Sequence, residues 1–127
     1  MVQKIKNKGD WYIAEIIERA EPKGITNQNP RRRCTTWINS VLIKADSPES
    51  AYDKALKVGK KDYETSYRTV VGIDIEWKVI GLANLIFISD DIEDGAEISW
   101  KDIGFVSANR GNNMVKSKEE LVDDLLR

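Results

Sequence analysis

The fold is decided by residues 36–59, which read TWINSVLIKADSPESAYDKALKVG. Aromatic and β-branched residues dominate the first half of this stretch and alternate with polar ones, as they do in β-strands. Residues 35–45 are therefore predicted to form a strand, one face of which carries Trp37, Val41, Ile43 and Ala45. The second half changes to helical spacing, so a strand should lead directly into a helix.

The predicted helix has a clear beginning and a clear end. Ser47 fits its N-cap, and Pro48 fits its first position, where the missing N–H costs nothing. Small and apolar residues then recur on one stripe: Ala51, Tyr52, Ala55 and Leu56. Because Gly59 is a common helix stop, we predict one main helix over about 47–58 with one buried face.

Further strands are predicted on both sides of this stretch. Residues 10–19 are rich in aromatic and β-branched residues, and residues 70–80 alternate between apolar and polar ones. Residues 84–88 fit either a strand or a turn of helix, and residues 98–106 are a further strand candidate. These elements predict an α+β fold, an antiparallel sheet of about four to five strands with the main helix packed on one face.

The chain is predicted to be a single domain, because 127 residues are the size of one ordinary domain. Within it, residues 1–9 are expected to be flexible and residues 105–127 to form a C-terminal extension. Ser117 and Glu120 fit a capping box, so this extension should contain a short helix.

The composition removes most of the usual catalytic chemistry. The chain has no histidine and one cysteine, Cys34, so it can build neither an imidazole-based triad nor a Cys/His zinc site. We therefore predict a non-enzymatic protein without a cofactor, a metal site or catalytic residues. A single thiol and the absence of a long apolar stretch predict a cytoplasmic protein that is not associated with a membrane.

Charge is spread unevenly, and the most basic spot is the run Arg31–Arg33. Residues 1–63 carry 13 Lys and Arg against 8 Asp and Glu, whereas residues 64–127 carry 7 against 13. The candidate contact residues for a nucleic acid or an acidic partner are Arg31, Arg32, Arg33, Lys60 and Lys61. Arginine side chains grip phosphate oxygens well, but a solvated basic loop would have the same composition.

Acidic residues supply another alternative, a metal-dependent hydrolase. Carboxylates occur in the run 90–94 and at alternate positions of the strand candidate 70–80, at Asp74 and Glu76. Their oxygen atoms suit Mg²⁺ or Ca²⁺, but the run lacks the spacing of an EF-hand loop. An exposed acidic turn and a solvated strand face are the simpler interpretations.

Several separated groups of residues resemble a known family. They are Trp11-Tyr12-x-Ala14-Glu15, the pattern W-I-x-x-V-x-I-x-A-D-S-P-E-x-A-Y-x-K-A over residues 37–55, Trp77-x-x-x-Gly81-Leu82-x-x-Leu85 and Asp94-Gly95-x-Glu97-Ile98. In this order they resemble the bacterial family called domain of unknown function 4288, over about residues 10–101. The resemblance implies a small bacterial cytoplasmic protein and transfers no catalytic residue. The shared aromatic residues fit a hydrophobic core.

We therefore expect a protein-binding or accessory module. A sheet with one covering helix leaves a face or an edge available, so a homodimer is an expected assembly. A nucleic-acid-binding protein that uses Arg31–Arg33 and a metal-dependent hydrolase that uses surface carboxylates are the alternatives.

Overall fold

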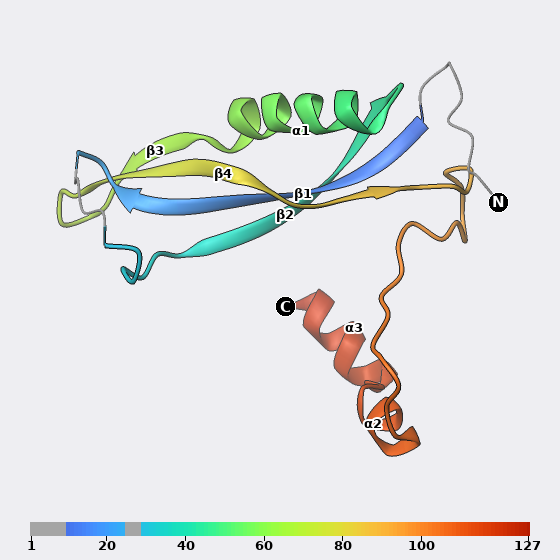
Figure 1. Cartoon of the computed structure of the whole chain (residues 1–127). Coiled ribbons are helices and arrows are strands. Elements are labelled where there is room, and N and C mark those ends of the chain that lie inside the picture. The colour runs from blue at the N-terminus through green and yellow to red at the C-terminus, as the bar shows by residue number, and fades with distance from the viewer. Residues whose placement is uncertain (1–9, 25–28) are drawn as a thin grey trace.

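The computed structural model describes residues 10–24 and 29–127, and residues 1–9, which were expected to be flexible, lie outside this part. The chain forms one curled sheet with a helix on one face and a tail that leaves the sheet (Figure 1). The strands are β1 (Asp10–Pro22), β2 (Thr36–Ala45), β3 (Thr65–Arg68) and β4 (Asp74–Phe87). The helices are α1 (Pro48–Tyr63), α2 (Ala108–Asn113) and α3 (Lys118–Leu126).

The sheet has the strand order β2-β1-β4-β3, and all three neighbouring pairs are antiparallel. β1 is long and lies between β2 and β4, so both of its edges are paired. The predicted α+β fold, with one main helix on a sheet and a short C-terminal helix, is confirmed. Within the described residues, no helix is long and apolar enough to cross a membrane.

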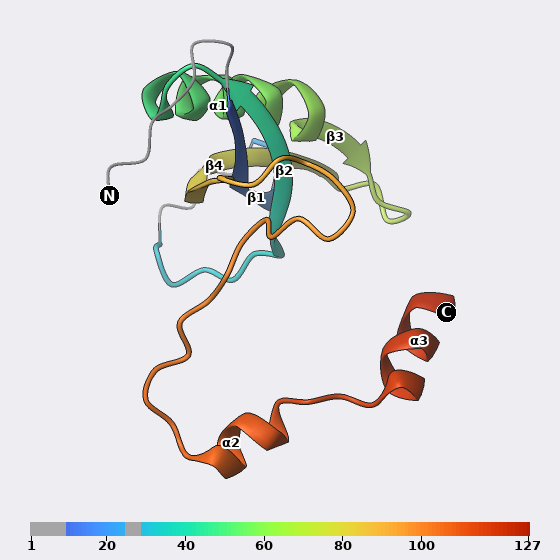
Figure 2. The same ribbon diagram turned by 90° about the vertical axis from the view of Figure 1, so that its right-hand side faces the viewer.

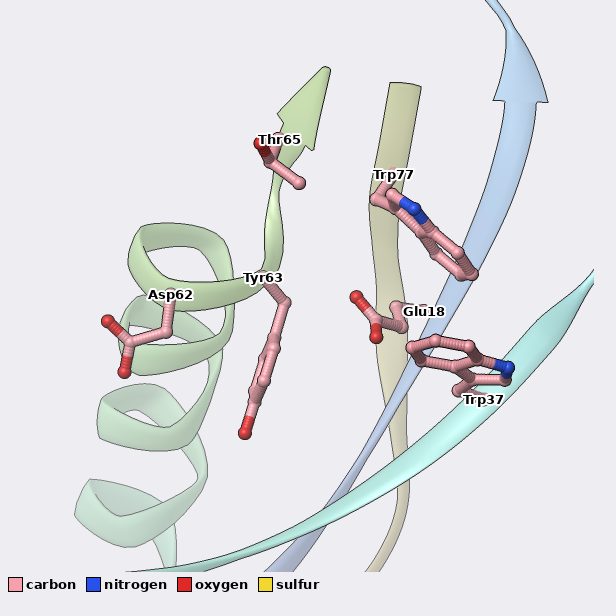
Figure 3. Close-up of a pocket in the computed structure, with 6 residues that line it drawn as sticks. All are labelled: Glu18, Trp37, Asp62, Tyr63, Thr65 and Trp77. Carbon is pink, nitrogen blue, oxygen red and sulfur yellow. The ribbon is translucent and has the colours of Figure 1, made fainter. Parts of the chain in front are cut away.

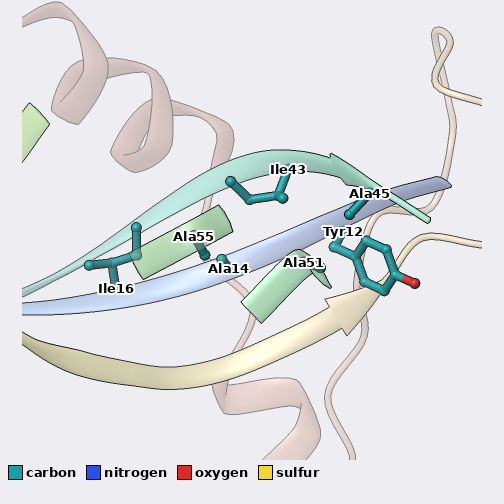
Figure 4. Packing of buried hydrophobic residues seen from close by; sticks show 7 residues of the cluster. All are labelled: Tyr12, Ala14, Ile16, Ile43, Ala45, Ala51 and Ala55. Carbon is teal, nitrogen blue, oxygen red and sulfur yellow. The ribbon is translucent and has the colours of Figure 1, made fainter. Parts of the chain in front are cut away.

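The core lies between α1 and the sheet (Figure 4). It consists of alternate residues on β1 and β2 together with small residues on the facing side of α1: Tyr12, Ala14, Ile16, Ile43, Ala45, Ala51 and Ala55. The alanines have no bulk beyond Cβ, so the helix can approach the sheet closely. Tyr12 closes one end of this core and packs edge to face against Phe87, with ring centroids 5.4 Å apart.

α1 begins as predicted and ends later than predicted. The Ser47 side chain accepts a hydrogen bond from the Ser50 N–H at 3.1 Å, which confirms the N-cap. Gly59 does not stop the helix, which continues to Tyr63. Gly59 is buried, and a Cβ at this position would lie 3.1 Å from Cγ2 of Ile16. This glycine therefore serves the close contact between α1 and β1.

The predicted strand over residues 70–80 and the apolar run over 84–88 are largely one strand, β4. Its pairing with β1 shifts register twice, between Glu15 and Ile16 and between Ile17 and Glu18. Each bulge places two residues of β4 opposite one of β1 and interrupts the alternation of faces. The strict alternation of apolar and polar residues that predicts the strand over 70–80 therefore could not predict the full length of β4.

The strand candidate over residues 98–106 is wrong, because this segment has no partner strand in the described structure. It is extended chain that leads away from the sheet toward α2 (Figure 1). Two elements were not predicted, namely β3 and α2. β3 is a short edge strand whose four residues are all exposed, and α2 is a single short helical segment, so neither shows an apolar pattern.

Candidate functional site

The basic run is divided between structural and solvated side chains. Arg32 Nε donates a hydrogen bond to Glu21 Oε1 at 2.7 Å, and Arg32 Nη1 donates to the Asn29 carbonyl at 3.1 Å. The hydrogen bond from Arg32 is also the main reason why the pKa of Glu21 is lowered. Arg32 thus ties its loop to the end of β1, whereas Arg31 and Arg33 are exposed.

The two candidate lysines are not brought together with this loop. Lys60 and Lys61 belong to the last turn of α1, which lies on one side of the sheet. The Arg31–Arg33 loop lies on the other side, in both Figure 1 and Figure 2. The five candidate residues therefore do not form one continuous basic face.

The candidate metal-binding carboxylates are engaged with other parts of the chain. Asp74 Oδ1 lies 2.8 Å from Arg68 Nε, and Glu76 Oε1 lies 3.8 Å from Lys78 Nζ. In the acidic run, Asp90 Oδ2 accepts a hydrogen bond from the Glu97 N–H at 3.1 Å. Across residues 10–24 and 29–127, no group of three or more acidic or thiol side chains is arranged to hold a metal ion.

The face of the sheet opposite α1, which we call the open face, carries a patch of apolar residues among charged and polar ones. Its apolar residues are Ile13, Ile17, Ile38, Leu42 and Ile86. The strand register places Leu42 and Ile86 on either side of Ile13, and Ile38 beside Ile17. Ile38 is 56% exposed and Leu42 is 52% exposed, so this patch faces solvent along β2.

A second group of exposed apolar residues lies in the tail, which we define as residues 97–127 and in which every residue is exposed. Its large apolar residues are Ile98, Trp100, Ile103, Phe105, Val106, Met114, Val115, Leu121, Val122, Leu125 and Leu126. Ser117 caps α3 as predicted, since its hydroxyl accepts a hydrogen bond from the Glu120 N–H at 3.1 Å. The tail lies on the same side of the sheet as the open face, in Figure 1 and Figure 2.

A cleft of about 150 Å³ lies where α1 ends, and it contains a residue that was not predicted as functional, Glu18. It is lined by Glu18, Trp37, Asp62, Tyr63, Thr65 and Trp77 (Figure 3). Glu18 is only 5% exposed, and its Oε1 accepts a hydrogen bond from Asn39 Nδ2 at 2.9 Å. Its carboxylate points into the space between Tyr63 and the tryptophan rings.

The two tryptophans of the cleft belong to different neighbours of β1. Trp37 on β2 and Trp77 on β4 meet with ring centroids 4.7 Å apart and ring planes tilted by 37°. Trp37 is 54% exposed, and Trp11 is 37% exposed beside Lys44, so the expectation that these rings fill the core is wrong for both. Of Trp11, Tyr12 and Trp37, Tyr12 is the one that is buried in the core.

Comparison with known proteins identifies a family and no closer relative. No curated protein and no solved structure matches the chain. One family model, described as a domain of unknown function (DUF4288), matches residues 11–100. This match includes α1, β2, β3, β4 and all of β1 except Asp10, and it excludes α2 and α3. Because the match covers well over half of the chain and contains the motifs quoted above, the chain belongs to the DUF4288 family.

Proposed function

We propose that the chain is a non-enzymatic protein-binding module whose partner is a second copy of itself. The observation that supports this most strongly is that one chain exposes apolar side chains in two places, at Ile38 and Leu42 of the open face and along the tail. They lie on the same side of the sheet, yet the tail leaves Ile38 and Leu42 of its own sheet about half exposed.

The tail needs a surface on which to pack. α3 has nine residues, and isolated helices shorter than about 12–15 residues are marginally stable in water. Its apolar residues include Leu125 at 86% and Leu126 at 79% exposure. Removing such side chains from water contributes about 25 cal/mol per Å² of apolar area, so packing them against an apolar sheet is strongly favoured.

A two-fold dimer satisfies both surfaces at once. If the tail of each protomer covers the open face of the other, the exchange is reciprocal and closes without a third component.

The alternatives have less support. Arg32 is occupied by Glu21, and Lys60 and Lys61 lie across the sheet from the arginine loop, which weakens a nucleic-acid interface. Asp74 and Glu76 each have a basic partner, which weakens a hydrolytic metal site. The single cysteine supports a reducing, cytoplasmic setting for the proposed dimer.

Light scattering coupled to size-exclusion chromatography tests the proposal on the full chain. We expect the wild type to have the mass of a dimer, and Leu125→Glu in the tail or Ile38→Glu on the open face to give monomers. The matched control is Tyr52→Glu, which places a charge at a 45%-exposed position of α1, outside both surfaces, and should stay dimeric. A wild type of monomeric mass at about 100 μM, a concentration well above a micromolar Kd, would refute self-association.

A further inference from the structure

Glu18 is a buried charge for which the described part of the chain supplies no ion-pair partner. Among residues 10–24 and 29–127, none of the ion pairs includes it, and the hydrogen bond that its side chain accepts, from Asn39, engages Oε1. An ionised carboxylate offers about four acceptor sites, and Oε2 of Glu18 is not among the buried polar atoms without a partner, so it is accessible from the cleft. Since the carboxylate points into a cleft, a ligand can supply the missing donor.

We propose that the cleft between Glu18, Tyr63 and the Trp37–Trp77 pair is a binding site for a guanidinium group, such as the side chain of arginine. The nearby negative charge favours a cation. Glu18 forms the floor, whereas the carboxylate of Asp62, which also belongs to the lining, is turned away from Tyr63 and the tryptophan rings (Figure 3). α1 ends at Tyr63, so the negative end of its dipole faces this region. Lys60 and Lys61 do not line the cleft.

The aromatic side chains select a flat cation. Trp37, Trp77 and Tyr63 line the cleft together, and aromatic faces attract cations most strongly where water is excluded. A guanidinium is planar and weakly hydrated and stacks on such faces, whereas an ammonium is compact and strongly hydrated. Its N–H groups can reach the free side of the Glu18 carboxylate while its plane lies along a ring.

The size of the cleft indicates one head group and no more. Its volume of about 150 Å³ is below the roughly 300–1,000 Å³ that is typical of sites for drug-sized ligands. A metal ion is a poorer occupant, because no set of three or more acidic or thiol ligands is present in the described residues. The rest of a guanidinium ligand would extend past the exposed ring of Trp37 into solvent.

The test uses the full chain labelled with ¹⁵N, because each tryptophan gives its own indole N–H signal in a proton–nitrogen correlation spectrum. L-arginine is added to millimolar concentration, and L-citrulline, a neutral compound of nearly the same shape, is the ligand control. We expect arginine to shift the signals of Trp37 and Trp77 and to leave those of Trp11 and Trp100 unchanged. Citrulline should shift none of them.

Variants then test the roles of the charge and the rings. Glu18→Gln should abolish the shifts, while Glu15→Gln, on the same strand but the opposite face, should keep them. Trp37→Leu, at a half-exposed position, should weaken arginine binding about 3- to 30-fold, the range expected for one cation–π contact. This variant tests the site even if Glu18→Gln fails to fold.

The free energy of unfolding separates a ligand site from a structural carboxylate. If Glu18 serves to bind a ligand, Glu18→Gln without arginine should be as stable as the wild type or more stable, since a largely buried charge that forms no ion pair within the described residues is removed. The proposal fails if arginine shifts neither tryptophan signal, if citrulline shifts them equally, or if Glu18→Gln destabilises the free protein and still binds arginine. The strand register puts Glu18, Trp37 and Trp77 on the same face of the sheet as the core that packs against α1, so these outcomes do not depend on the oligomeric state.

Discussion

The contact between Ile16 on β1 and Gly59 on α1 gives a sharp test of how the helix packs. Ile16 is completely buried, and a Cβ added at Gly59 would lie 3.1 Å from its Cγ2 and 3.4 Å from its Cδ1. The next neighbour, Cγ2 of Val79, would be at an ordinary distance of 3.5 Å. We predict that the effect of Gly59→Ala on stability reverses its sign when Ile16 is replaced by alanine.

The magnitudes follow from the two opposing effects. Alanine in place of glycine stabilises a helix interior by about 1 kcal/mol, whereas overpacking a core costs about 1–3 kcal/mol. Gly59→Ala alone should therefore lower the free energy of unfolding by about 0–2 kcal/mol. Ile16→Ala alone should cost about 2–5 kcal/mol. In the double variant the close atoms of Ile16 are gone, so Gly59→Ala should restore about 1 kcal/mol.

Urea unfolding followed by far-ultraviolet circular dichroism, at one fixed protein concentration, measures all four proteins of this cycle. Ile73→Ala is the control for replacing an isoleucine by alanine outside the core, because Ile73 is 50% exposed in the β3–β4 turn. This replacement should lower the free energy of unfolding by less than about 1 kcal/mol. If Gly59→Ala changed stability by the same amount with isoleucine and with alanine at position 16, the close contact between the two elements would not be what requires glycine.

Two further predictions concern titratable groups. The Tyr12 hydroxyl is buried without a hydrogen-bond partner in the described structure, so Tyr12→Phe should raise the free energy of unfolding by about 1 kcal/mol, with Tyr63→Phe as the control. Burial also raises the pKa of Tyr12 above 10.0, so the free energy of unfolding of the wild type should fall as the pH rises past this value. A Tyr12→Phe variant that showed the same fall would contradict the attribution of this fall to Tyr12. At the acid end, Arg32 lowers the pKa of Glu21 below 4.5, so the pair should stabilise the fold above pH 4.5 and lose its effect as the pH falls through the lowered value. The measurement is the midpoint temperature of thermal unfolding as a function of pH from 4.5 downward. Arg32→Ala should make this midpoint less dependent on pH, whereas Arg31→Ala should leave its pH dependence unchanged.

The local signals in the sequence predict the ends of elements only where the cause is also local. The beginning of α1 is such a case, because the Ser47 cap is a contact between residues three apart. The glycine rule fails at Gly59, since the reason for that glycine is Ile16, which lies 43 positions away in the sequence. β4 is a similar case, because its bulges are defined only by the register with β1.

Glu18 could have been found from the sequence by position alone. It continues the alternation of Tyr12, Ala14 and Ile16, so a strand over residues 10–19 places it on the core face. The signal was missed because a single acidic residue near the end of a strand is normally solvated. The meeting of Trp37 with Trp77 was out of reach, because it depends on both strands lying beside β1.

The two proposals concern opposite faces of one sheet, and the family match separates them further. Glu18, Trp37, Tyr63 and Trp77 all lie within the matched residues 11–100, so the cleft belongs to the part of the chain that defines the family. The tail lies almost wholly beyond residue 100, while the open face that it would cover lies within the match. A β-sheet side chain points to one face or the other, so substitutions at Glu18 and at Ile38 act on separate surfaces. Dimerisation and arginine binding should therefore be lost independently of each other.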